Sequence, residues 1–289
     1  INALREEGYN IESVNKKGYR LAEKPDDILL SENIAYNLPT EFIGKKVIHL
    51  DTVGSTNDYA KEIGNKVSGG TLIISEQQTK GKGRLGRVWK SKSGDGIWMS
   101  LIIKPKIEPY KAPFLTLVAG ASVVKALSNL DVEASIKWPN DIIVHNKKIC
   151  GILTELSAEM ERVNYVVIGI GINIKTIDFP DEIKEKATSL YKEGYKLSRV
   201  DIVRQFCIEF EKLYKGYILD GNKQDTLELC RKYSAIIGKQ VYVIKNNKRE
   251  LVKCIDINEN GNLIVKEKNG EIQEIMSGEV SIRGVKGYV

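Results

Sequence analysis

The chain has 289 residues, which is long for one ordinary domain and predicts two or three modules. Apolar residues make up 42% of the chain and charged residues 28%, which excludes an intrinsically disordered protein and supplies a sizeable core. The formal net charge of +6 is compatible with a polyanionic partner but does not require DNA.

Several other classes are excluded by what the chain lacks. No run of 18 apolar residues and no secretory signal is visible, so we expect no membrane span and a cytoplasmic location. The two histidines, His49 and His145, are too few for a His-rich metal site or a serine-protease triad. The cysteines lack zinc-site spacing and predict free thiols in a reducing compartment: Cys150, Cys207, Cys230 and Cys254. The first residue is Ile1 rather than Met, so we expect that residues are missing before it.

The N-terminal segment predicts the end of a helix over residues 1–4, with Gly8 as its stop. NIESV and YRLAE, joined by a turn at 15–18, predict a β-hairpin, and residues 25–27 read as a linker. A helix end followed by a short hairpin is typical of the tail of a winged helix-turn-helix. A stray N-terminal hairpin is an equally weighted alternative.

The middle of the chain mixes strands with helices. Strand-like segments are KVIHLDTV, TLIISEQ, GIWMSLIIKP, ASIKW, DIIVHN, KICGILTEL and NYVVIGIGINI, with a tight polar turn at Asn146–Lys147. Helices are predicted from a cap at Ser55, Thr56 or Asn57, over 112–130, from Ser198 through Tyr217, and over 224–234. Because the order is not a strict alternation, we expect an α+β fold with a central mixed sheet and helices on one side.

From residue 238 onward, short alternating strands predict a small SH3-like β-domain. Asn260-Gly261 and Asn269-Gly270 predict hairpin turns of type I′, in which both central residues need positive φ. We therefore divide the chain into a winged-helix remnant with linker (1–26), a catalytic domain (27–237) and a C-terminal domain (238–289).

The motif GKGRLG (81–86) matches the dinucleotide fingerprint G-x-G-x-x-G, but its context does not. No helix follows it, and the apolar strand segment 101–103 stands where an acidic residue is needed. What remains is a glycine-rich basic loop with six cations in 13 residues: Lys80, Lys82, Arg84, Arg87, Lys90 and Lys92. Such a loop predicts a mobile clamp that becomes ordered on a bound phosphate or carboxylate. A plain solvated loop is the alternative.

Three further motifs could carry chemistry. KWPNDI (137–142) joins a lysine, an amide and a carboxylate at a strand junction, although an ordinary Asn-Asp turn is the simpler interpretation. In KKICGILTEL, Lys148 enters a strand in which Gly151 permits close backbone approach. GIGIN ends a β-branched strand at Asn173.

In this order, DTVGSTND, QTKGKGRLGRVW with SKSGDGIWMSL, KWPNDI, KKICGILTEL and GIGINI resemble biotin protein ligase over residues 27–289. The resemblance implies a fold like class II aminoacyl-tRNA synthetases and biotin synthetase, with an SH3-like C-terminal barrel. It implies ATP-dependent formation of biotinyl-5′-adenylate and transfer of biotin to a lysine of a biotin carboxyl carrier protein. Lys82 stands where the family has arginine, so charge is kept but a bidentate fork is lost.

The resemblance also implies residue roles. Residues implied to bind biotin are Ser55, Thr56, Asn57, Gln78, Gly81, Gly83, Arg84, Lys148 and Gly151. Residues implied to bind ATP or the adenylate are Arg84, Arg87, Trp89, Lys137, Asn140 and Asn173. Lys148, Arg84 and Lys137 are implied to be catalytic, and Asp141 is a weaker ligand candidate for the Mg²⁺ that accompanies ATP.

Two alternatives stay open from sequence. A lipoate ligase shares the fold and the adenylation chemistry. A DNA-binding repressor would use the adenylate as corepressor and bind operator DNA through a helix-turn-helix upstream of Ile1. A homodimer through the central sheet is an expectation from the resemblance alone.

Overall fold

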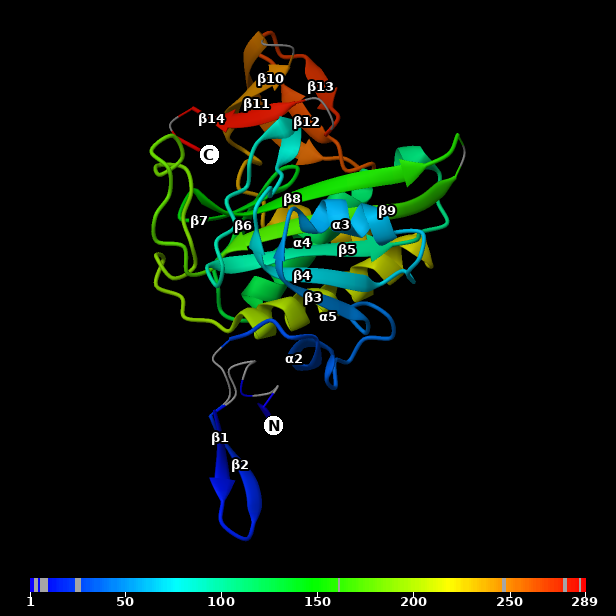
Figure 1. Cartoon of the computed structure of the whole chain (residues 1–289). Helices are drawn as coiled ribbons and strands as arrows, with labels where there is room; N and C mark the ends of the chain where they lie inside the picture. Colours follow the sequence, from blue (N-terminus) through cyan, green and yellow to red (C-terminus); the bar gives the residue numbers. More distant parts are fainter. Residues whose placement is uncertain are drawn as a thin grey trace.

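The computed structural model describes residues 1–2, 5, 10–23, 27–160, 162–245, 248–277, 280–285 and 287–289. The strands form three sheets: an N-terminal hairpin, a seven-stranded sheet and a five-stranded sheet. In Figure 1 the hairpin lies at one end of the molecule and the five-stranded sheet at the other, with the seven-stranded sheet between them. The predicted division at residues 26/27 and 237/238 places one sheet in each segment.

The N-terminal hairpin is confirmed. Its strands, β1 (Asn10–Val14) and β2 (Gly18–Glu23), pair antiparallel around a turn in which Gly18 has a φ of 95°. The predicted helix stop at Gly8 and the first two residues of the linker, Pro25 and Asp26, lie outside the described residues.

The central sheet is mixed, as predicted. Its strand order is β3-β4-β5-β9-β8-β7-β6, and within the described strands the one parallel pair is β3 with β4. The strands are β3 (Val47–Val53), β4 (Thr71–Gln78), β5 (Gly96–Ile103), β6 (Ser135–Lys137), β7 (Asp141–Val144), β8 (Lys147–Ala158) and β9 (Val163–Asn173). KWPNDI therefore does join two strands, since β6 ends at Lys137 and β7 begins at Asp141.

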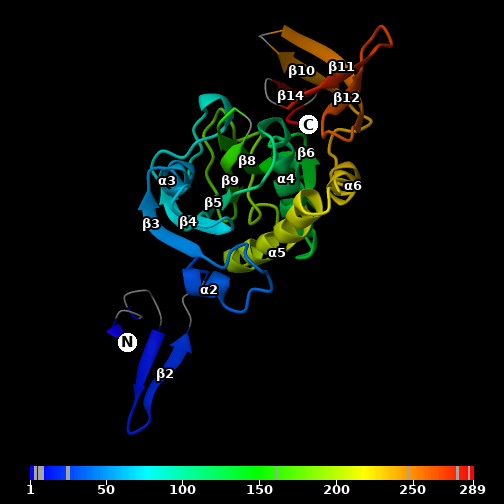
Figure 2. The same cartoon turned by 90° about the vertical axis from the view of Figure 1, so that its right-hand side faces the viewer.

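Helices cover both faces of this sheet, so the expectation of helices on one side is wrong. Helices α4 (Phe114–Ser128) and α5 (Arg199–Ile218) pack on one face, and Figure 2 shows α3 (Thr56–Ile63) on the other. Ala60 of α3 is buried against Ile73 and Val167 in a second apolar cluster. The alternation of β4 sends successive side chains to opposite faces, which gives each helix layer its own apolar surface. The short helices α2 (Ser31–Ala35) and α6 (Gln224–Lys232) complete the body.

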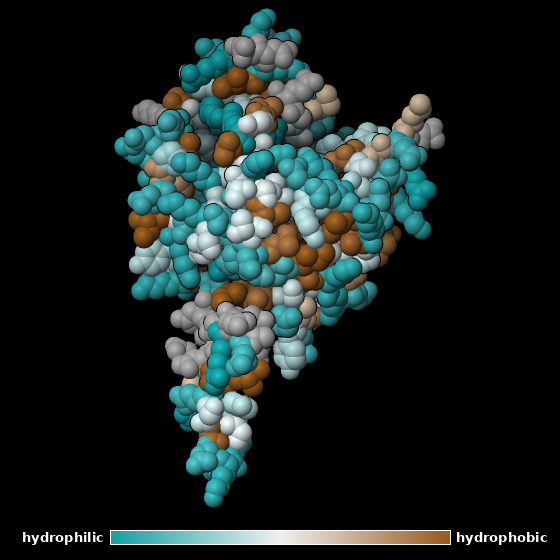
Figure 3. Space-filling view, in the orientation of Figure 1, coloured by the Kyte–Doolittle hydropathy of each residue, from teal (hydrophilic) through white to brown (hydrophobic). Residues whose placement is uncertain are grey.

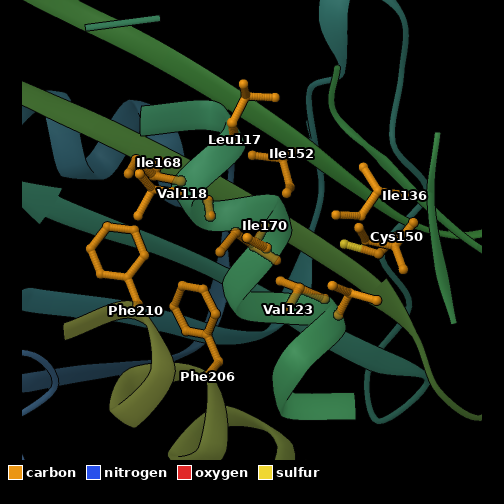
Figure 4. Close-up of a cluster of buried hydrophobic side chains, with 14 of the residues drawn as sticks. Leu117, Val118, Val123, Ile136, Cys150, Ile152, Ile168, Ile170, Phe206 and Phe210 are labelled. Carbon is orange, nitrogen blue, oxygen red and sulfur yellow. The ribbon is translucent and has the colours of Figure 1, made fainter. Parts of the chain in front are cut away.

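Helix α4 forms the centre of the main core. It is apolar on all sides, and Figure 4 shows Leu117, Val118 and Val123 of α4 in one cluster with side chains of β9 and α5: Ile168, Ile170, Phe206 and Phe210. Within the described residues, the stretch Pro109–Ser128 is the one helical segment long and apolar enough to cross a membrane, but 72% of its 18-residue apolar window is buried. A helix that is hydrophobic all round belongs in a protein core when other elements cover it in this way. The outer face in Figure 3 is mostly hydrophilic, with hydrophobic residues gathered over the middle of the body.

The C-terminal sheet has the order β13-β12-β11-β10-β14, all antiparallel. Its strands are β10 (Gln240–Lys245), β11 (Lys248–Ile257), β12 (Leu263–Lys266), β13 (Ile272–Ile275) and β14 (Ser281–Gly284). The predicted type I′ turns are wrong in type. Gly261 and Gly270 have positive φ, but Asn260 and Asn269 do not, because both connections are longer loops. The two-residue turn with both φ values positive is instead His145–Asn146, one residue before the predicted position.

The C-terminal sheet contacts the central body closely. Trp138, which is buried beside the KWPNDI junction, donates from Nε1 to the carbonyl oxygen of Gly261 over 3.0 Å. A Cβ at Gly261 would lie 2.4 Å from Leu117 of α4, so the loop approaches the helix too closely for a larger residue. The loop after β11 is thereby fixed against the core, and the chain that follows reaches back to the site described next.

Candidate functional site

The predicted site residues lie around two adjoining hollows at one end of the central sheet. The inner pocket and the outer cleft share the residues Gly83, Arg84, Trp89, Asn140 and Lys148. Ligands in the two hollows would therefore meet at this shared wall.

The N-terminus of α3 forms a polar wall of the inner pocket. Ser55 caps the helix by accepting from the backbone N–H of Asp58, as predicted. The backbone N–H and the hydroxyl of Thr56 both donate to Gln78 Oε1, over 2.8 and 3.0 Å. Ser100 on β5 lies within hydrogen-bond distance of Thr56 and Asn57, whose amide also donates to Glu155 over 2.7 Å. These polar side chains hold one another in fixed orientations, which suits a ligand with its own donors and acceptors.

The floor of the inner pocket consists of glycines beneath Trp89. A Cβ at Gly171 would lie 2.5 Å from Trp89 Nε1, and one at Gly151 would lie 2.9 Å from its ring. A Cβ at Gly169 would lie 2.1 Å from the amide oxygen of Asn57. The three glycines let the indole and the amide approach the strands β8 and β9 directly. Gly151 belongs to the predicted biotin set, whereas Gly169 and Gly171 are the two glycines of GIGIN and have no predicted role.

The basic loop is a compact turn that leads into β5 and opens no α-helix, so it lacks the following helix that the dinucleotide fingerprint requires. Trp89 and Gly83 donate from their backbone N–H groups to the carbonyl oxygens of Gly81 and Arg87, over 2.9 and 2.7 Å. A single 3-10 turn, η1 (Arg84–Gly86), sits at the tip, and Leu85 adopts a φ of 57°. Gly81 packs on the backbone of Trp89, so it shapes the loop and does not line either hollow.

Lys82 is the residue at which the loop departs from the family pattern. Its ammonium lies 2.7 Å from the carboxylate of Asp58 in the first turn of α3. Burial raises the pKa of Asp58, but the ammonium groups of Lys82 and Lys61 outweigh this and leave the pKa lowered. Lys82 therefore ties the loop to the helix that forms the polar wall.

Arg84 connects the two hollows with the C-terminal sheet. Its guanidinium donates to Asn140 Oδ1 and to the carbonyl oxygen of Ser277, each over 2.8 Å. Burial lowers the pKa of Arg84, although the group remains a cation at neutral pH. Its place on the shared wall suits contact with an anion that extends from one hollow to the other.

Lys137, Asp141 and Lys148 form a buried charge cluster beneath the outer cleft. Lys148 Nζ lies 2.5 Å from Asp141 Oδ1, and the hydroxyl of Tyr288 donates to Asp141 Oδ2. Lys137 is 2% exposed, and burial lowers its pKa to about 7. Burial raises the pKa of Asp141, but Lys148, Tyr288 and Lys137 outweigh this and leave it lowered. With Arg84 and Arg87 nearby, cations outnumber carboxylates here, which favours a polyanionic ligand.

The donors present do not form a site for a resident metal ion. Within the described part of the chain, no group of three or more histidine, cysteine, aspartate or glutamate side chains comes together. Both oxygens of Asp141 are already engaged by Lys148 and Tyr288. A divalent cation prefers several free oxygen ligands, so we treat Mg²⁺ as part of the nucleotide substrate.

The sequence-based set and the two hollows agree closely. All residues predicted for biotin except Gly81 line the inner pocket, and all six predicted for the nucleotide line the outer cleft. Asn173 ends β9 there and donates to the carbonyl oxygen of Thr188 over 3.1 Å. The assigned roles remain predictions, since position alone does not identify a ligand.

Sequence reasoning missed three parts of the outer cleft. One is the loop after β9, which pairs with Lys148 and contributes Phe179, Ile183 and Lys186. The others are Arg283 and Tyr288, which come from the C-terminal sheet and the segment after it. Their separation of about 150 residues from KWPNDI leaves no local sequence signal.

Comparison with known proteins gives consistent matches. The model of the Biotin/lipoate A/B protein ligase family matches residues 50–173, and that of the Biotin protein ligase C terminal domain matches residues 236–283. The bifunctional ligase/repressor BirA of Bacillus subtilis is 41% identical over 98% of this chain and 87% of its own length. BirA of Escherichia coli is 28% identical over 99% and 88%. The structure of biotin protein ligase from Aquifex aeolicus in complex with biotin and ATP has a TM-score of 0.73 and 31% identity, covering 83% of this chain and 99% of that one.

Proposed function

Since the chain belongs to the biotin protein ligase family, we propose that it activates biotin with ATP and transfers it to a lysine of a biotin carboxyl carrier protein. The observation that supports this most directly is the shared wall between the two hollows. Biotin in the inner pocket and ATP in the outer cleft would bring a carboxylate and an α-phosphate together at Arg84 and Lys148.

The first step must join two anions. An oxygen of the biotin carboxylate attacks the α-phosphorus of ATP, the bond to the β-phosphate oxygen breaks, and pyrophosphate leaves with its electron pair. Arg84 and Lys148 would hold the carboxylate in line, while Lys137 and Arg87 would stabilise negative charge on the phosphates. Mg²⁺ bound to ATP would add further screening of the phosphate charge.

The second step needs no protein nucleophile. The amine of the acceptor lysine attacks the acyl carbon of the mixed anhydride, the acyl–oxygen bond breaks, and AMP leaves. Lys148 would donate to the acyl carbonyl oxygen as charge develops on it. The indole of Trp89 and the loop 79–92 would exclude water from the adenylate until the acceptor arrives.

Binding partners follow from the same reasoning. We propose an apo biotin carboxyl carrier domain as the acceptor and a cytoplasmic setting in which it is available. The relatives named BirA are described as bifunctional ligase/repressors. The N-terminal hairpin fits the tail of a winged helix, so a biotin-dependent repressor acting on operator DNA, as a homodimer, is part of the proposal.

The proposal is tested by incubating the protein with ATP, Mg²⁺, biotin and an apo-carboxyl-carrier domain. We expect a mass increase on the carrier that corresponds to one biotinyl group, together with released pyrophosphate. Lipoate serves as the parallel substrate. Pyrophosphate release and mass transfer with lipoate, and neither with biotin, would reject the assignment.

A further inference from the structure

Tyr288, which follows the last strand of the C-terminal sheet, reaches the charge cluster of the central sheet. It is 9% exposed and makes three contacts there. Its carbonyl oxygen accepts from Lys137 Nζ over 2.7 Å, and the same ammonium lies 3.3 Å from the centroid of its ring. Its hydroxyl donates to Asp141 Oδ2. One residue of the C-terminal segment thus contacts both a cation and a carboxylate of the outer cleft.

The segment that carries Tyr288 folds back on β14. The backbone N–H of Gly284 donates to the carbonyl oxygen of Tyr288 over 3.3 Å. A Cβ at Gly284 would lie 2.3 Å from the backbone of Val289, so only glycine allows this approach. The hydrogen bond and close approach at Gly284 therefore hold Tyr288 against β14.

Through Asp141 the contact extends to a second lysine. Asp141 accepts from Tyr288 with one oxygen, and its other oxygen lies 2.5 Å from Lys148 Nζ. Lys137 ends β6 and Lys148 is the second residue of β8, so the two lysines lie on different strands. Tyr288 and Asp141 together fix both flexible side chains relative to each other, which removes conformational freedom that a ligand would otherwise have to restrict.

We propose that Tyr288 is a positioning residue for the adenylation step, holding Lys137 by its carbonyl and ring and Lys148 through Asp141. This inference rests on the proposed function, because the two lysines are assigned there to the phosphates and the carboxylate. The C-terminal sheet then contributes to the chemistry without itself touching the reacting atoms. Burial and the neighbouring Asp141 raise the pKa of Tyr288, so its hydroxyl stays a donor throughout the neutral range.

The test separates the two half-reactions. Adenylation is measured as biotin-dependent exchange of labelled pyrophosphate into ATP, and transfer is measured from pre-formed biotinyl-5′-adenylate to the apo-carrier domain. Tyr288→Phe removes the hydroxyl and keeps the ring and carbonyl, whereas Tyr288→Leu also removes the ring. Tyr110→Phe, at a tyrosine that is 75% exposed, is the matched control.

We expect kcat/KM for ATP in the exchange to fall roughly 10- to 100-fold in Tyr288→Phe, the effect of losing a hydrogen bond to a charged group. Tyr288→Leu should fall further, and transfer from the added adenylate should change less than about threefold in both. Thermal melts of the Phe variant should fall by only a few degrees, the cost of one buried hydrogen bond, because packing is conserved.

The possible outcomes distinguish failure of the proposed function from failure of the positioning role of Tyr288. Wild type that gives no biotin-dependent exchange would overturn the proposed function itself. Active wild type with Tyr288→Phe equal to Tyr110→Phe would overturn the positioning role alone. An equal loss in both half-reactions, with a melting temperature lowered by more than a few degrees, would also overturn it, because that is the pattern of a structural residue.

Discussion

Replacing Lys137 with methionine should make the protein more stable and inactive. The ammonium is 2% exposed, and burial lowers its pKa from 10.5 to about 7. Each unit of pKa is worth about 1.4 kcal/mol, so keeping Lys137 charged in the folded chain costs about 5 kcal/mol. Methionine of similar length avoids that cost but removes the hydrogen bond from Lys137 to the carbonyl oxygen of Tyr288, which keeps only the Gly284 N–H, at about 1–3 kcal/mol. We expect Lys137→Met to raise the free energy of unfolding by about 3 kcal/mol at pH 6.

The pH dependence provides a second, independent check. Between pH 7 and 10.5 the unfolded chain keeps the proton on Lys137 and the folded chain releases it. The contribution of Lys137 to the free energy of unfolding of the wild type therefore increases with pH across that window, by about 1.4 kcal/mol per pH unit. The advantage of the methionine variant should be largest below pH 7 and should decline steadily toward pH 10.

The assay is denaturant unfolding of wild type and variant at pH 6, 7, 8 and 9. Equal m-values for the two proteins would show that the same surface is exposed on unfolding, so that their free energies can be compared. Lys212→Met, at an exposed position of α5, is the control and should show no pH-dependent difference. Biotin-dependent pyrophosphate exchange should fall by about 10²-fold or more in Lys137→Met, because one cation facing the phosphates is lost. A variant less stable than wild type at pH 6, or a stability difference that is the same at every pH, would refute the reasoning.

Three further predictions concern the loop and the floor of the inner pocket. Arg84→Gly removes the hydrogen bonds to Asn140 and to the carbonyl oxygen of Ser277, so the adenylate should dissociate and label lysines of bystander proteins. Adenylate retention is measured by filtration, and retention equal to wild type would contradict this prediction. Gly171→Ala places a Cβ 2.5 Å from Trp89 Nε1, so KM for biotin should rise about 10-fold and tryptophan fluorescence should change. An unchanged KM would contradict this, because it would mean that the indole can move away from β9 without affecting biotin binding. Lys82→Arg should change kcat by less than about threefold, because arginine can also pair with the half-exposed carboxylate of Asp58. A larger change in steady-state kinetics would contradict this and would show that Lys82 contacts the ligand.

Most of the candidate site could be predicted because its motifs are local. Each cluster of chemistry-bearing residues falls at a strand end or a helix start, where alternation and capping residues mark the boundary. Ser55 at the start of α3 and Asn173 at the end of β9 are examples. Their assembly into two hollows required the resemblance, since no periodicity predicts that β4, β5, β9 and β8 would be neighbours in that order.

The features that sequence missed depend on contacts between distant segments. Helix α3 is amphipathic on its own, and nothing in it indicates which face of the sheet it covers. The close approach of Trp89 to Gly171 joins residues 82 positions apart, and that of Tyr288 to Lys137 joins residues 151 apart. The turn at His145–Asn146 was misplaced by one residue because non-glycine residues seldom take positive φ at two successive positions.

The charge cluster favours phosphate binding next to the glycine-rich loop, although the loop lacks the context of a dinucleotide site. Arg84 is half-buried and Lys137 is buried, and burial lowers the pKa of both, so the cations are held in an environment that disfavours them. One carboxylate, Asp141, is shared with Lys148 and does not neutralise them all. A bound polyanion would relieve this imbalance, and relief would be greatest where negative charge accumulates during transfer at the α-phosphorus. The buried cations lower the free energy of unfolding, and the same cations favour binding of a charged transition state. Variants that remove them should therefore be both more stable and less active.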